Sequence, residues 1–366
     1  MRSTTLDDGS PRPNTNTAQA HRPRTLCSYG IGVSDQHVSR SQTVGSPTAR
    51  PGELFVAGEA LIDLVADPDG RYRAVPGGSP ANVAVGLARL GAPTHLLARL
   101  GTGAFGRIIR EHLASNDVLL DAAVTTSDPT TLAVVTLDDE ARATYDFYAE
   151  GTADWGWSEA ELPARLPAGA LALVTGSIAA AREPGSTAVL ELVRRVRGRG
   201  EASVVLDPNL RPGLLGSREQ AQQRWAELVT LADVVKVSDE DLAWLVPGAD
   251  ATRVAADWAG RGPALVVVTL GAGGAHAVTA TGTTVRVPAR SVDVVDTVGA
   301  GDAFTAGLVD SLRLAGLLGR EYRDRLAGAD PESLRPVLDR AALAAALTCS
   351  RVGADPPTAD ELTGWS

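Results

Sequence analysis

The sequence is poor in cysteine. Its 366 residues include two, Cys27 and Cys349, which lie far apart along the chain. Two cysteines cannot form a disulfide framework, and the five histidines show no metal-ligand spacing with them or with one another. We therefore expect neither a disulfide scaffold nor a structural zinc site, and we expect a reducing cytoplasm as the compartment.

Excess basic charge and long apolar runs are also lacking. The formal net charge is −10, so no basic surplus is available to neutralise the phosphates of a nucleic acid. No apolar run has the roughly 18 residues that a membrane span requires, and none near the amino terminus resembles a signal-peptide core. We expect neither a nucleic acid nor a membrane as a partner.

The first 52 residues differ in composition from the rest. They hold six arginines and three acidic residues, and serine, threonine, proline and asparagine fill most other positions. Segments with so little apolar surface do not form a core of their own. We predict a disordered extension over residues 1–52 and a folded domain over residues 53–366. A regulatory or targeting arm is the alternative interpretation of the extension.

Beyond residue 52, short apolar runs alternate with segments of helical periodicity. The runs are aliphatic on both faces, as in strands that lie between two layers of helices. This order predicts a three-layer α/β/α fold with a mostly parallel central sheet. The predicted strands are Leu54–Gly58, His95–Leu100, Leu171–Thr175, Ser203–Leu206, Val234–Val237 and Leu265–Thr269. The predicted helices are Ala81–Leu90, Arg107–Ser115, Gly185–Arg197, Gln220–Leu231 and Thr305–Leu314.

Two regions break this alternation. Residues 64–75 contain the turn sequence Asp67-Pro68-Asp69-Gly70. Residues 131–149 contain two β-rich runs separated by the polar sequence Asp-Asp-Glu-Ala-Arg-Ala. Each region predicts a hairpin outside the main sheet.

Polar residues and glycines follow the carboxyl ends of several predicted strands. Open α/β sheets bind their ligands at this edge, so the sequence predicts a site there. The residues concerned are Asp207, Asn209, Arg211, Lys236, Ser238, Asp241, Thr269, Gly271 and Gly274.

The most specific motif is Asp-Thr-Val-Gly-Ala-Gly-Asp-Ala-Phe at residues 296–304, which leads into a helical pattern. The glycines allow a tight turn into a helix whose free amides and dipole favour an anion. Asp302 would stand beside that anion as a base that orients a hydroxyl for phosphoryl transfer. The alternative is a glycine-rich turn in which Asp302 only caps the helix.

A second motif, Pro-Gly-Gly-Ser-Pro-Ala-Asn at residues 76–82, also precedes a helical pattern. Its two glycines permit close backbone approach. Asn82 offers both a donor and an acceptor, which suits a neutral ligand rich in hydroxyl groups.

Together and in this order, the two motifs resemble the signature segments of the PfkB, or ribokinase-like, carbohydrate kinases. The resemblance extends over essentially Glu53–Pro357. It implies one α/β/α domain with a small β lid, formed here by residues 64–75 and 131–149. It also implies transfer of the γ-phosphate of ATP to a sugar hydroxyl, with Mg²⁺ held largely through phosphates and water. A homodimer formed through the lid is compatible with this family.

The resemblance also assigns roles to residues. It implies that Asp302 is the catalytic base and that Gly299, Ala300 and Gly301 form the anion hole. The implied sugar contacts are Asp63, Gly77, Gly78, Asn82 and Arg211. The implied nucleotide contacts are Asn209, Lys236, Ser238, Thr269, Gly271 and Gly274. Asp241 matches the acid tied to Mg²⁺, and the carbonyls near a K⁺ site are those of Asp296, Val298, Thr348 and Gly353.

Three segments depart from the family pattern. The family's Asn-x-x-Glu element is Ser-Asp-Glu-Asp at residues 238–241, which keeps an acid on a shorter side chain. Residues 101–106 lack the acid that is usual in that segment, so the resemblance does not predict a substrate contact there. Pro357 stands where some relatives have a hydroxyl, which leaves activation by K⁺ open.

Four segments resemble fructokinases more than ribokinases. They are residues 58–63, 77–82, 145–148 and 207–211. They favour conversion of fructose to fructose 6-phosphate. The 2-keto-3-deoxygluconate kinases share part of this set, and Arg211 offers a cation for their carboxylate substrate. That activity and ribokinase activity are the alternatives.

Two other classes of function also remain. Residues 101–106 read Gly-x-Gly-x-x-Gly, with Asp121 about 20 residues later, as in an NAD-dependent oxidoreductase. However, Asp121 follows only the short run Val118–Leu120, instead of ending a second strand. A non-catalytic nucleotide- or sugar-binding protein is the other alternative. The retained Asp302 disfavours it, and the altered residues 238–241 keep it open.

Overall fold

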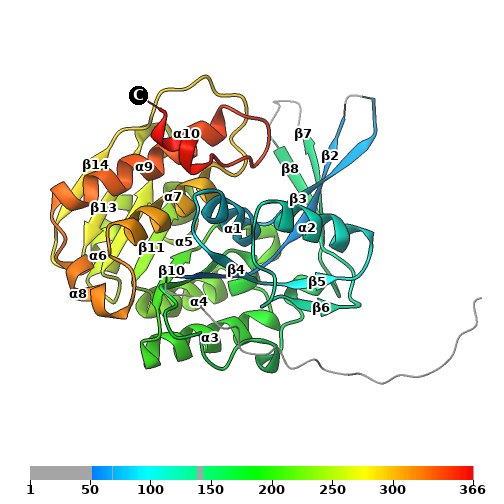
Figure 1. The fold of residues 1–366 in the computed structure, drawn as a ribbon, viewed down its shortest axis with the longest axis horizontal. Coiled ribbons are helices and arrows are strands. Elements are labelled where there is room, and N and C mark those ends of the chain that lie inside the picture. Colours follow the sequence, from blue (N-terminus) through cyan, green and yellow to red (C-terminus); the bar gives the residue numbers. More distant parts are fainter. Residues whose placement is uncertain (1–51, 68, 138–142, 366) are drawn as a thin grey trace, which may run out of the picture. The chain divides into compact units, whose positions relative to one another are not determined.

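The computed structural model describes residues 52–67, 69–137 and 143–365. The chain divides into two units, residues 1–42 and residues 43–366, and the first lies wholly outside the described residues. The extension predicted over residues 1–52 therefore falls almost entirely outside them, as does the connection at residues 138–142. Figure 1 shows the fold of the second unit.

Within the described residues, eight strands form one main sheet. Their order is β14 (Thr284–Val287), β13 (Ala275–Thr279), β12 (Leu265–Thr269), β11 (Val234–Ser238), β10 (Ser203–Asp207), β9 (Ala172–Gly176), β1 (Leu54–Ala57) and β4 (Thr94–Leu97). The strands from β12 to β4 run parallel, whereas β13 and β14 are antiparallel additions at one edge. The mostly parallel sheet is confirmed.

Helices cover both faces of this sheet. Alternate residues of β1 illustrate this, because Leu54 and Val56 pack into one hydrophobic layer while Phe55 and Ala57 pack into the other. The first layer holds α1 (Ser79–Arg89), α2 (Ala104–Ser115), α7 (Ala300–Leu314), α8 (Arg323–Ala327) and α9 (Pro331–Cys349). The second holds α3 (Gly185–Arg199), α4 (Arg218–Leu231), α5 (Asp239–Leu245) and α6 (Ala251–Ala259). The three-layer α/β/α prediction is therefore confirmed.

Several helices begin at a polar side chain that caps their free amides. The hydroxyl of Ser217 accepts the amide of Gln220 at the start of α4, and Asp330 accepts the amide of Ser333 at the start of α9. Each such cap stabilises a helix by about 1 kcal/mol. Helix α7 differs, since it begins at Gly299 with no capping side chain in the described residues. Its amides are left for another partner.

A second sheet, which we call the lid sheet, has four strands in the described part of the chain. Their order is β3 (Tyr72–Gly77), β2 (Leu61–Ala66), β7 (Leu132–Leu137) and β8 (Ala143–Tyr148). The two predicted ribbons are therefore present, and the parallel pairing of β2 with β7 joins them into one sheet. In Figure 1 these strands project beside α1 and α2, apart from the main sheet.

The strand predicted over His95–Leu100 is wrong as a single element. The chain pairs with β1 only as far as Leu97, and β5 (Arg99–Gly101) then pairs with β6 (Val124–Thr126) in a separate small sheet. The amide of Val124 bonds to the carbonyl of Ala98 at the bend. The Gly-x-Gly-x-x-Gly segment thus follows a strand that lies outside the main sheet.

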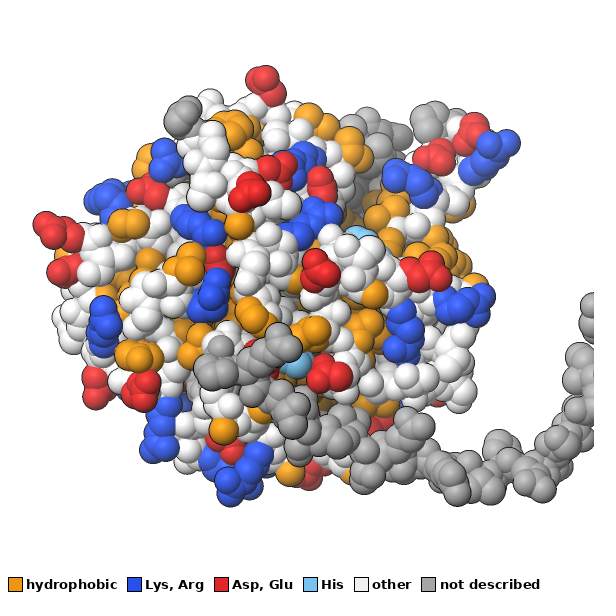
Figure 2. Space-filling model, viewed as in Figure 1, with side chains coloured by type: hydrophobic (Ala, Val, Ile, Leu, Met, Phe, Trp, Pro, Cys, Tyr) orange, Lys and Arg blue, Asp and Glu red, His pale blue; other side chains and the backbone are white. Residues whose placement is uncertain are grey.

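The sequence patterns also missed β13 and β14. Exposed and buried residues alternate along β14, as is typical of an edge strand, and such short runs are hard to separate from loops. Among the described residues we find no helix whose length and hydrophobicity would let it cross a lipid bilayer. On the face shown in Figure 2, acidic and basic side chains are interspersed.

Candidate active site

The first turn of α7 carries Asp302. Gly299 starts this helix with φ at 76°, a left-handed conformation that favours glycine, and an added Cβ would lie 2.5 Å from the Cβ of Ala354. The amide of Ala300 donates to the carbonyl of Thr297 at 3.3 Å. The following two amides have no partner within the helix. An anion hole here would therefore use the amides of residues 301 and 302 in preference to that of residue 300.

Three polar side chains hold the carboxylate of Asp302. Ser79 donates its hydroxyl to Oδ1 at 2.7 Å, and Asn82 donates its Nδ2 to Oδ2 at 2.9 Å. Asn209 donates its Nδ2 to Oδ1 at 3.3 Å. These donors come from α1 and from the loop after β10, so the two sequence motifs meet at one carboxylate.

The surroundings of Asp302 favour proton acceptance. Burial raises the pKa of Asp302, and the charge of Asp207 raises it further. Hydrogen bonds from Ser79 and Asn82 and the charge of Lys236 oppose that rise without cancelling it. A carboxylate with a raised pKa and a fixed orientation is suited to act as a general base.

Lys236 places a buried ammonium group beside the start of α7. Its Nζ donates to Oδ2 of Asp207 at 2.9 Å, and Thr305 donates its hydroxyl to the same oxygen at 2.7 Å. A Cβ added at Gly301 would lie 3.3 Å from this Nζ. Burial alone would lower the pKa of Lys236, but the charge of Asp207 and other nearby acids raises it above its ordinary value. The ammonium therefore stays charged next to the free helix amides.

Asp241 lies in the first turn of α5, directly after β11, the strand that holds Lys236. Its amide is capped by the hydroxyl of Ser238 at 3.0 Å, and its Oδ1 accepts the amide of Leu210 at 3.0 Å. Burial and the charge of Asp207 raise the pKa of Asp241, against the lowering effect of Lys236. No three acidic, histidine or cysteine side chains cluster as metal ligands in the described residues. A divalent ion would thus use the second oxygen of Asp241 and the phosphates of a nucleotide, which suits Mg²⁺.

A glycine-rich turn follows β12 on the far side of Ser238. Thr269, which ends β12, pairs with Ser238 across the sheet. Gly271 and Gly274 have φ values of 51° and 85°, and a Cβ at Gly274 would lie 2.0 Å from the carbonyl oxygen of Val287. The turn therefore requires glycine, and it follows the strand next to β11 in the sheet.

The lid sheet contributes Asp63 from the opposite side. Gly77 pairs with Leu61 in the β2–β3 ladder, and a Cβ there would lie 2.2 Å from Oδ2 of Asp63. Gly78, with φ at 99°, then turns the chain into α1. Burial raises the pKa of Asp63 to about 6, with a lowering contribution from Arg211 and a raising one from Asp302. The charges of Arg211 and Asp302 both act on Asp63, so these three side chains lie near one another.

Arg211 is partly committed to its own loop. Its Nη1 donates to Oδ1 of Asn209 at 2.9 Å and to the carbonyl of Leu210 at 2.8 Å. Asn209, with φ at 37°, thereby bridges Arg211 and Asp302. The left-handed backbone at Asn209 is tolerated best by glycine and asparagine.

Tyr145 and Phe147 lie on the same face of β8, where their rings stack with centroids 6.0 Å apart. Burial raises the pKa of Tyr145, and the charge of Asp63 raises it further, so its hydroxyl lies near the site. Phe147 packs against the buried cluster that includes Trp155, which favours ordinary lid packing. Tyr148 is 64% exposed.

Four residues of this site were not assigned roles from the sequence. Ser79 lies within the second motif and Asp207 ends a predicted strand, so both positions carried a usable signal. Tyr145 lies in segment 145–148, which resembles fructokinases, but no role was assigned to it. Thr305 carried no signal, because a threonine inside a helix usually packs. Only the fold brings them to the site.

The residues predicted to line a K⁺ site lie around Asp296. Its Oδ1 accepts the amide of Val298 at 3.0 Å, and its Oδ2 accepts the amide of Gly353 at 2.8 Å. Thr348 lies in the last turn of α9, and its carbonyl accepts the amide of Arg351 at 3.1 Å. The four predicted residues thus come from one small region, although two of their amides and one carbonyl already bond to protein.

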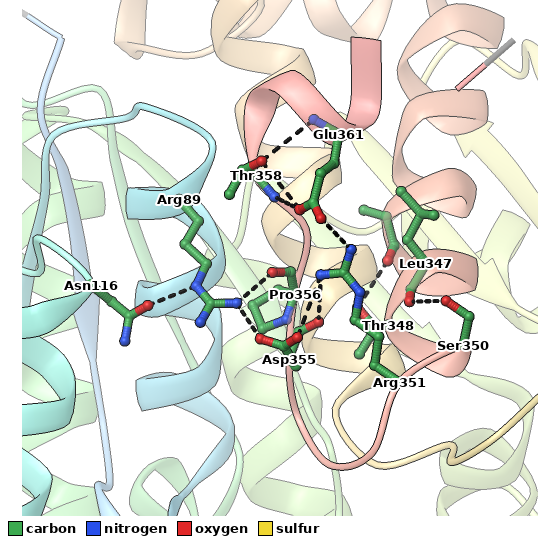
Figure 3. Close-up of polar contacts among 11 residues, drawn as sticks. Arg89, Asn116, Leu347, Thr348, Ser350, Arg351, Asp355, Pro356, Thr358 and Glu361 are labelled. Carbon is green, nitrogen blue, oxygen red and sulfur yellow. Dashed lines mark hydrogen bonds and ion pairs between the residues drawn. The ribbon is translucent and has the colours of Figure 1, made fainter. Parts of the chain in front are cut away.

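The segment that carries Gly353 is fastened at both ends (Figure 3). Arg89 of α1 donates to the carbonyl of Pro356 at 2.7 Å and pairs with Asp355. Arg351 pairs with Glu361 of α10 (Ala359–Thr363) at 2.6 Å. These contacts hold the chain that packs against the turn at Gly299.

Comparisons with known proteins agree with this geometry. Residues 52–361 match the pfkB family carbohydrate kinases. Fructokinase from Klebsiella pneumoniae is 38% identical over 290 residues, which cover 77% of this chain and 89% of that protein. The crystal structure of fructokinase from Xylella fastidiosa with bound ATP superposes with a TM-score of 0.78 at 32% identity, covering 86% of this chain and 98% of that one. Aminoimidazole riboside kinase from Salmonella enterica gives a TM-score of 0.71 at 30% identity, covering 85% and 98%.

The chain belongs to the pfkB family of carbohydrate kinases. It is an ATP-dependent sugar kinase, and its family implies ATP, a divalent metal ion and a small sugar as its ligands. The oxidoreductase alternative is wrong, and the fold gives the physical reason, since β5 lies outside the main sheet.

Proposed function

We propose that this sugar kinase is a fructokinase, which transfers the γ-phosphate of ATP to fructose and forms fructose 6-phosphate. The observation that carries the proposal is the Asp302 carboxylate, held by Ser79 and Asn82 between the lid sheet and the start of α7. Asp302 would take the proton of the sugar hydroxyl as that oxygen attacks the γ-phosphate.

The sugar would lie between the lid sheet and α1. Asp63 and Asn82 would accept and donate hydrogen bonds to its hydroxyl groups, with Arg211 at the side. Gly77 and Gly78 would let the backbone approach the sugar closely, because no side chain stands there.

The phosphates would lie over the start of α7. Free amides at residues 301 and 302, together with the ammonium group of Lys236, would stabilise the charge that is transferred. Asn209 would orient the γ-phosphate. The turn formed by Thr269, Gly271 and Gly274, with Ser238 beside it, would hold the rest of the nucleotide.

Mg²⁺ is the divalent ion that the site would take. Asp241 offers one free oxygen, and Mg²⁺ commonly uses one or two carboxylates together with phosphates and water. K⁺ would bind near the carbonyls of residues 296, 298, 348 and 353. Its charge would support the free helix end, which favours anions.

The balance of charge in the sugar half supports fructose over a sugar acid. Arg211 is the cation that would meet a carboxylate, but it is bonded to its own loop and faces Asp63. A neutral polyol suits this pairing, whereas 2-keto-3-deoxygluconate would bring a second negative charge towards Asp63 and Asp302. The solved fructokinase of Vibrio cholerae, 29% identical with a TM-score of 0.74, binds fructose, ADP and calcium, which adds support.

We also propose that residues 53–366 suffice for catalysis and that the protein acts in the cytoplasm. The exposed Tyr72 and Tyr148 of the lid sheet support a homodimer formed through this sheet.

The experiment that tests the function is an ATP-consumption assay with Mg²⁺, in K⁺ and in Na⁺ buffers. Fructose, ribose, 2-keto-3-deoxygluconate, tagatose 6-phosphate and adenosine would be compared by kcat/KM. We expect turnover on fructose to exceed that on the others. Preference for another sugar would overturn the substrate and leave the kinase chemistry in place. Binding of ATP without turnover on any of them would favour a non-catalytic binding protein.

A further inference from the structure

The lid sheet joins the rest of the domain at four crossings of the chain. We call these crossings the lid base and define it as residues 58–60, 78, 129–131 and 149–154. They lead into β2, out of β3, into β7 and out of β8. The orientation of the lid sheet therefore depends on how the lid base is held.

Asp154 connects three of these crossings. It lies in the turn η1 (Ala153–Trp155) that follows β8, and 1% of its surface is exposed. Its Oδ1 accepts the amide of Ala60 at 2.9 Å, and Ala60 directly precedes β2. Thr131, which directly precedes β7, lies close enough to lower the pKa of Asp154 and shares a 2.6 Å hydrogen bond with the hydroxyl of Thr152. One carboxylate thus links the start of β2 to the end of β8.

Glu59 connects the same crossing to the main sheet. Its Oε2 accepts the amide of Ala179 at 3.1 Å, in the turn η3 (Ile178–Ala180) that follows β9. A Cβ at Gly78 would lie 2.8 Å from the backbone oxygen of Glu59, so the fourth crossing packs here too. Glu59 is therefore bound to the core through its side chain, and the next residue, Ala60, is bound through its amide to the end of the lid sheet.

These two acids are costly to bury. Burial raises the pKa of Glu59 to about 7 and that of Asp154 to about 6. In the described residues no cation acts on the pKa of either acid, and Oδ2 of Asp154 has no hydrogen-bond partner there. A buried acid without a cation is destabilising, and an apolar side chain of similar size would usually be preferred. Their presence is better explained by the position that they impose on the lid.

The lid base controls where the sugar-side residues lie. Asp63 follows Ala60 by three residues on β2, and Tyr145 lies on β8, which leads to Asp154. A small rotation at the lid base would move Asp63 relative to Asp302, which α7 holds in the core. Misplacement by about 1 Å can lower turnover by about 10²-fold.

We propose that Glu59 and Asp154 are positioning residues that fix the lid sheet on the core and thereby set the sugar-binding geometry. The proposal rests on the sugar-binding role proposed for Asp63. The contacts of both acids in the described residues lie at or beside the lid base, away from the nucleotide half of the site. Replacing them should therefore change the binding of the sugar more than that of ATP.

The test compares Asp154→Ala and Asp154→Asn with the matched controls Asp233→Ala and Asp233→Asn. Asp233 is equally buried and also accepts a strand amide, that of Val204 at 2.9 Å, but it precedes β11 at the other end of the sheet. We expect Asp154→Ala to raise the KM for fructose about tenfold or more and to change the KM for ATP less than about twofold. Asp154→Asn should keep the KM for fructose close to the wild-type value, because the side-chain oxygen of Asn can still accept the amide of Ala60. The Asp233 variants should leave the KM for fructose unchanged.

A KM for fructose that Asp154→Ala leaves unchanged would overturn the proposal, as would equal increases for fructose and ATP. If Asp154→Ala does not fold, Thr131→Val removes the hydroxyl that bonds to Thr152 and lies near the same carboxylate, and it should raise the KM for fructose about threefold. An unchanged value there would also overturn the proposal.

Amide exchange separates this proposal from the proposed function. Hydrogen exchange of residues 58–66 in the unliganded protein should become about tenfold faster in Asp154→Ala and stay unchanged in the Asp233 variants. This result is independent of the sugar. If fructose proves not to be the substrate, faster exchange still supports the positioning role, and unchanged exchange overturns it.

Discussion

Two aspartates at opposite ends of the central sheet are buried to the same extent but are bonded differently. Asp233, directly before β11, accepts the amide of Val204 on Oδ2 and faces Arg323 at 2.8 Å and Arg197 at 3.0 Å through Oδ1. Asp207, the last residue of β10, receives Lys236 and Thr305 on the single oxygen Oδ2. Its Oδ1 is buried without a partner in the described residues.

This difference distinguishes a structural acid, Asp233, from an acid of the active site, Asp207. Asp233 has a donor for each oxygen, as expected where a buried charge only joins elements. Asp207 leaves one oxygen free beside an ammonium group and an uncapped helix, where an incoming ligand can change the pairing. A buried polar atom without a partner lowers the stability of the folded protein. At the carboxyl end of the sheet, the same unpartnered atom is available to bind a ligand.

The strongest way to test this contrast is to remove a charge at the carboxyl end. Asp302→Asn keeps the size of the side chain but cannot accept the proton of the sugar hydroxyl. We expect kcat to fall by about 10²–10⁴-fold while ATP affinity stays within about threefold of wild type. A variant with near-normal kcat would contradict the assignment of the base.

The converse change at the amino end should affect stability alone. Asp233→Ala leaves the amide of Val204 unpaired and removes the partner of two arginines that are about one-third exposed. We expect a loss of about 2–3 kcal/mol in the free energy of unfolding, below the cost of a fully buried pair. Urea unfolding measures the loss, and the ATP-consumption assay should show an unchanged kcat. A lower kcat in the folded Asp233→Ala protein would contradict the conclusion that Asp233 has only a structural role.

The smallest effect concerns pH and the lid base. The pKa of Glu59 is raised to about 7 in the folded protein from an ordinary value of 4.5, so the folded state binds this proton more tightly than the unfolded state. The contribution of Glu59 to stability is therefore full below about pH 4.5 and is lost as the pH rises through about 7. We expect Glu59→Gln to gain on the order of 1–2 kcal/mol relative to wild type between pH 5 and pH 8.

Paired urea titrations of wild type and Glu59→Gln at several pH values isolate this contribution, since all other groups titrate in both proteins. A difference that stays constant with pH would show that the pKa of Glu59 is the same in the folded and unfolded states, which would contradict the raised pKa. Gln retains an oxygen for the amide of Ala179, so the KM for fructose should change little.

Much of this architecture could be predicted from local patterns. Continuous aliphatic runs predicted the parallel strands, and the motifs around Asn82 and Asp302 predicted two segments that meet in the structure. The contact of Ala60 with Asp154 could not be predicted, because 94 residues separate them and neither shows a pattern. The bend at Ala98 was missed for a similar reason, since β5 and β6 are too short to carry a period. The unpartnered oxygen of Asp207 depends wholly on the side chains that surround it.

The contacts of residues 351–361 affect how the protein folds while it is being synthesised. Gly353, which bonds to Asp296, lies 57 residues after it, and Ala354 packs against the turn at Gly299. A chain that grows from its amino terminus folds its early parts first. The phosphate-binding turn can therefore reach its final shape only after the segment that packs against it has emerged from the ribosome. Until then the nascent chain can assemble its sheet without completing the turn, so kinase activity has to wait until residues 351–361 have been made.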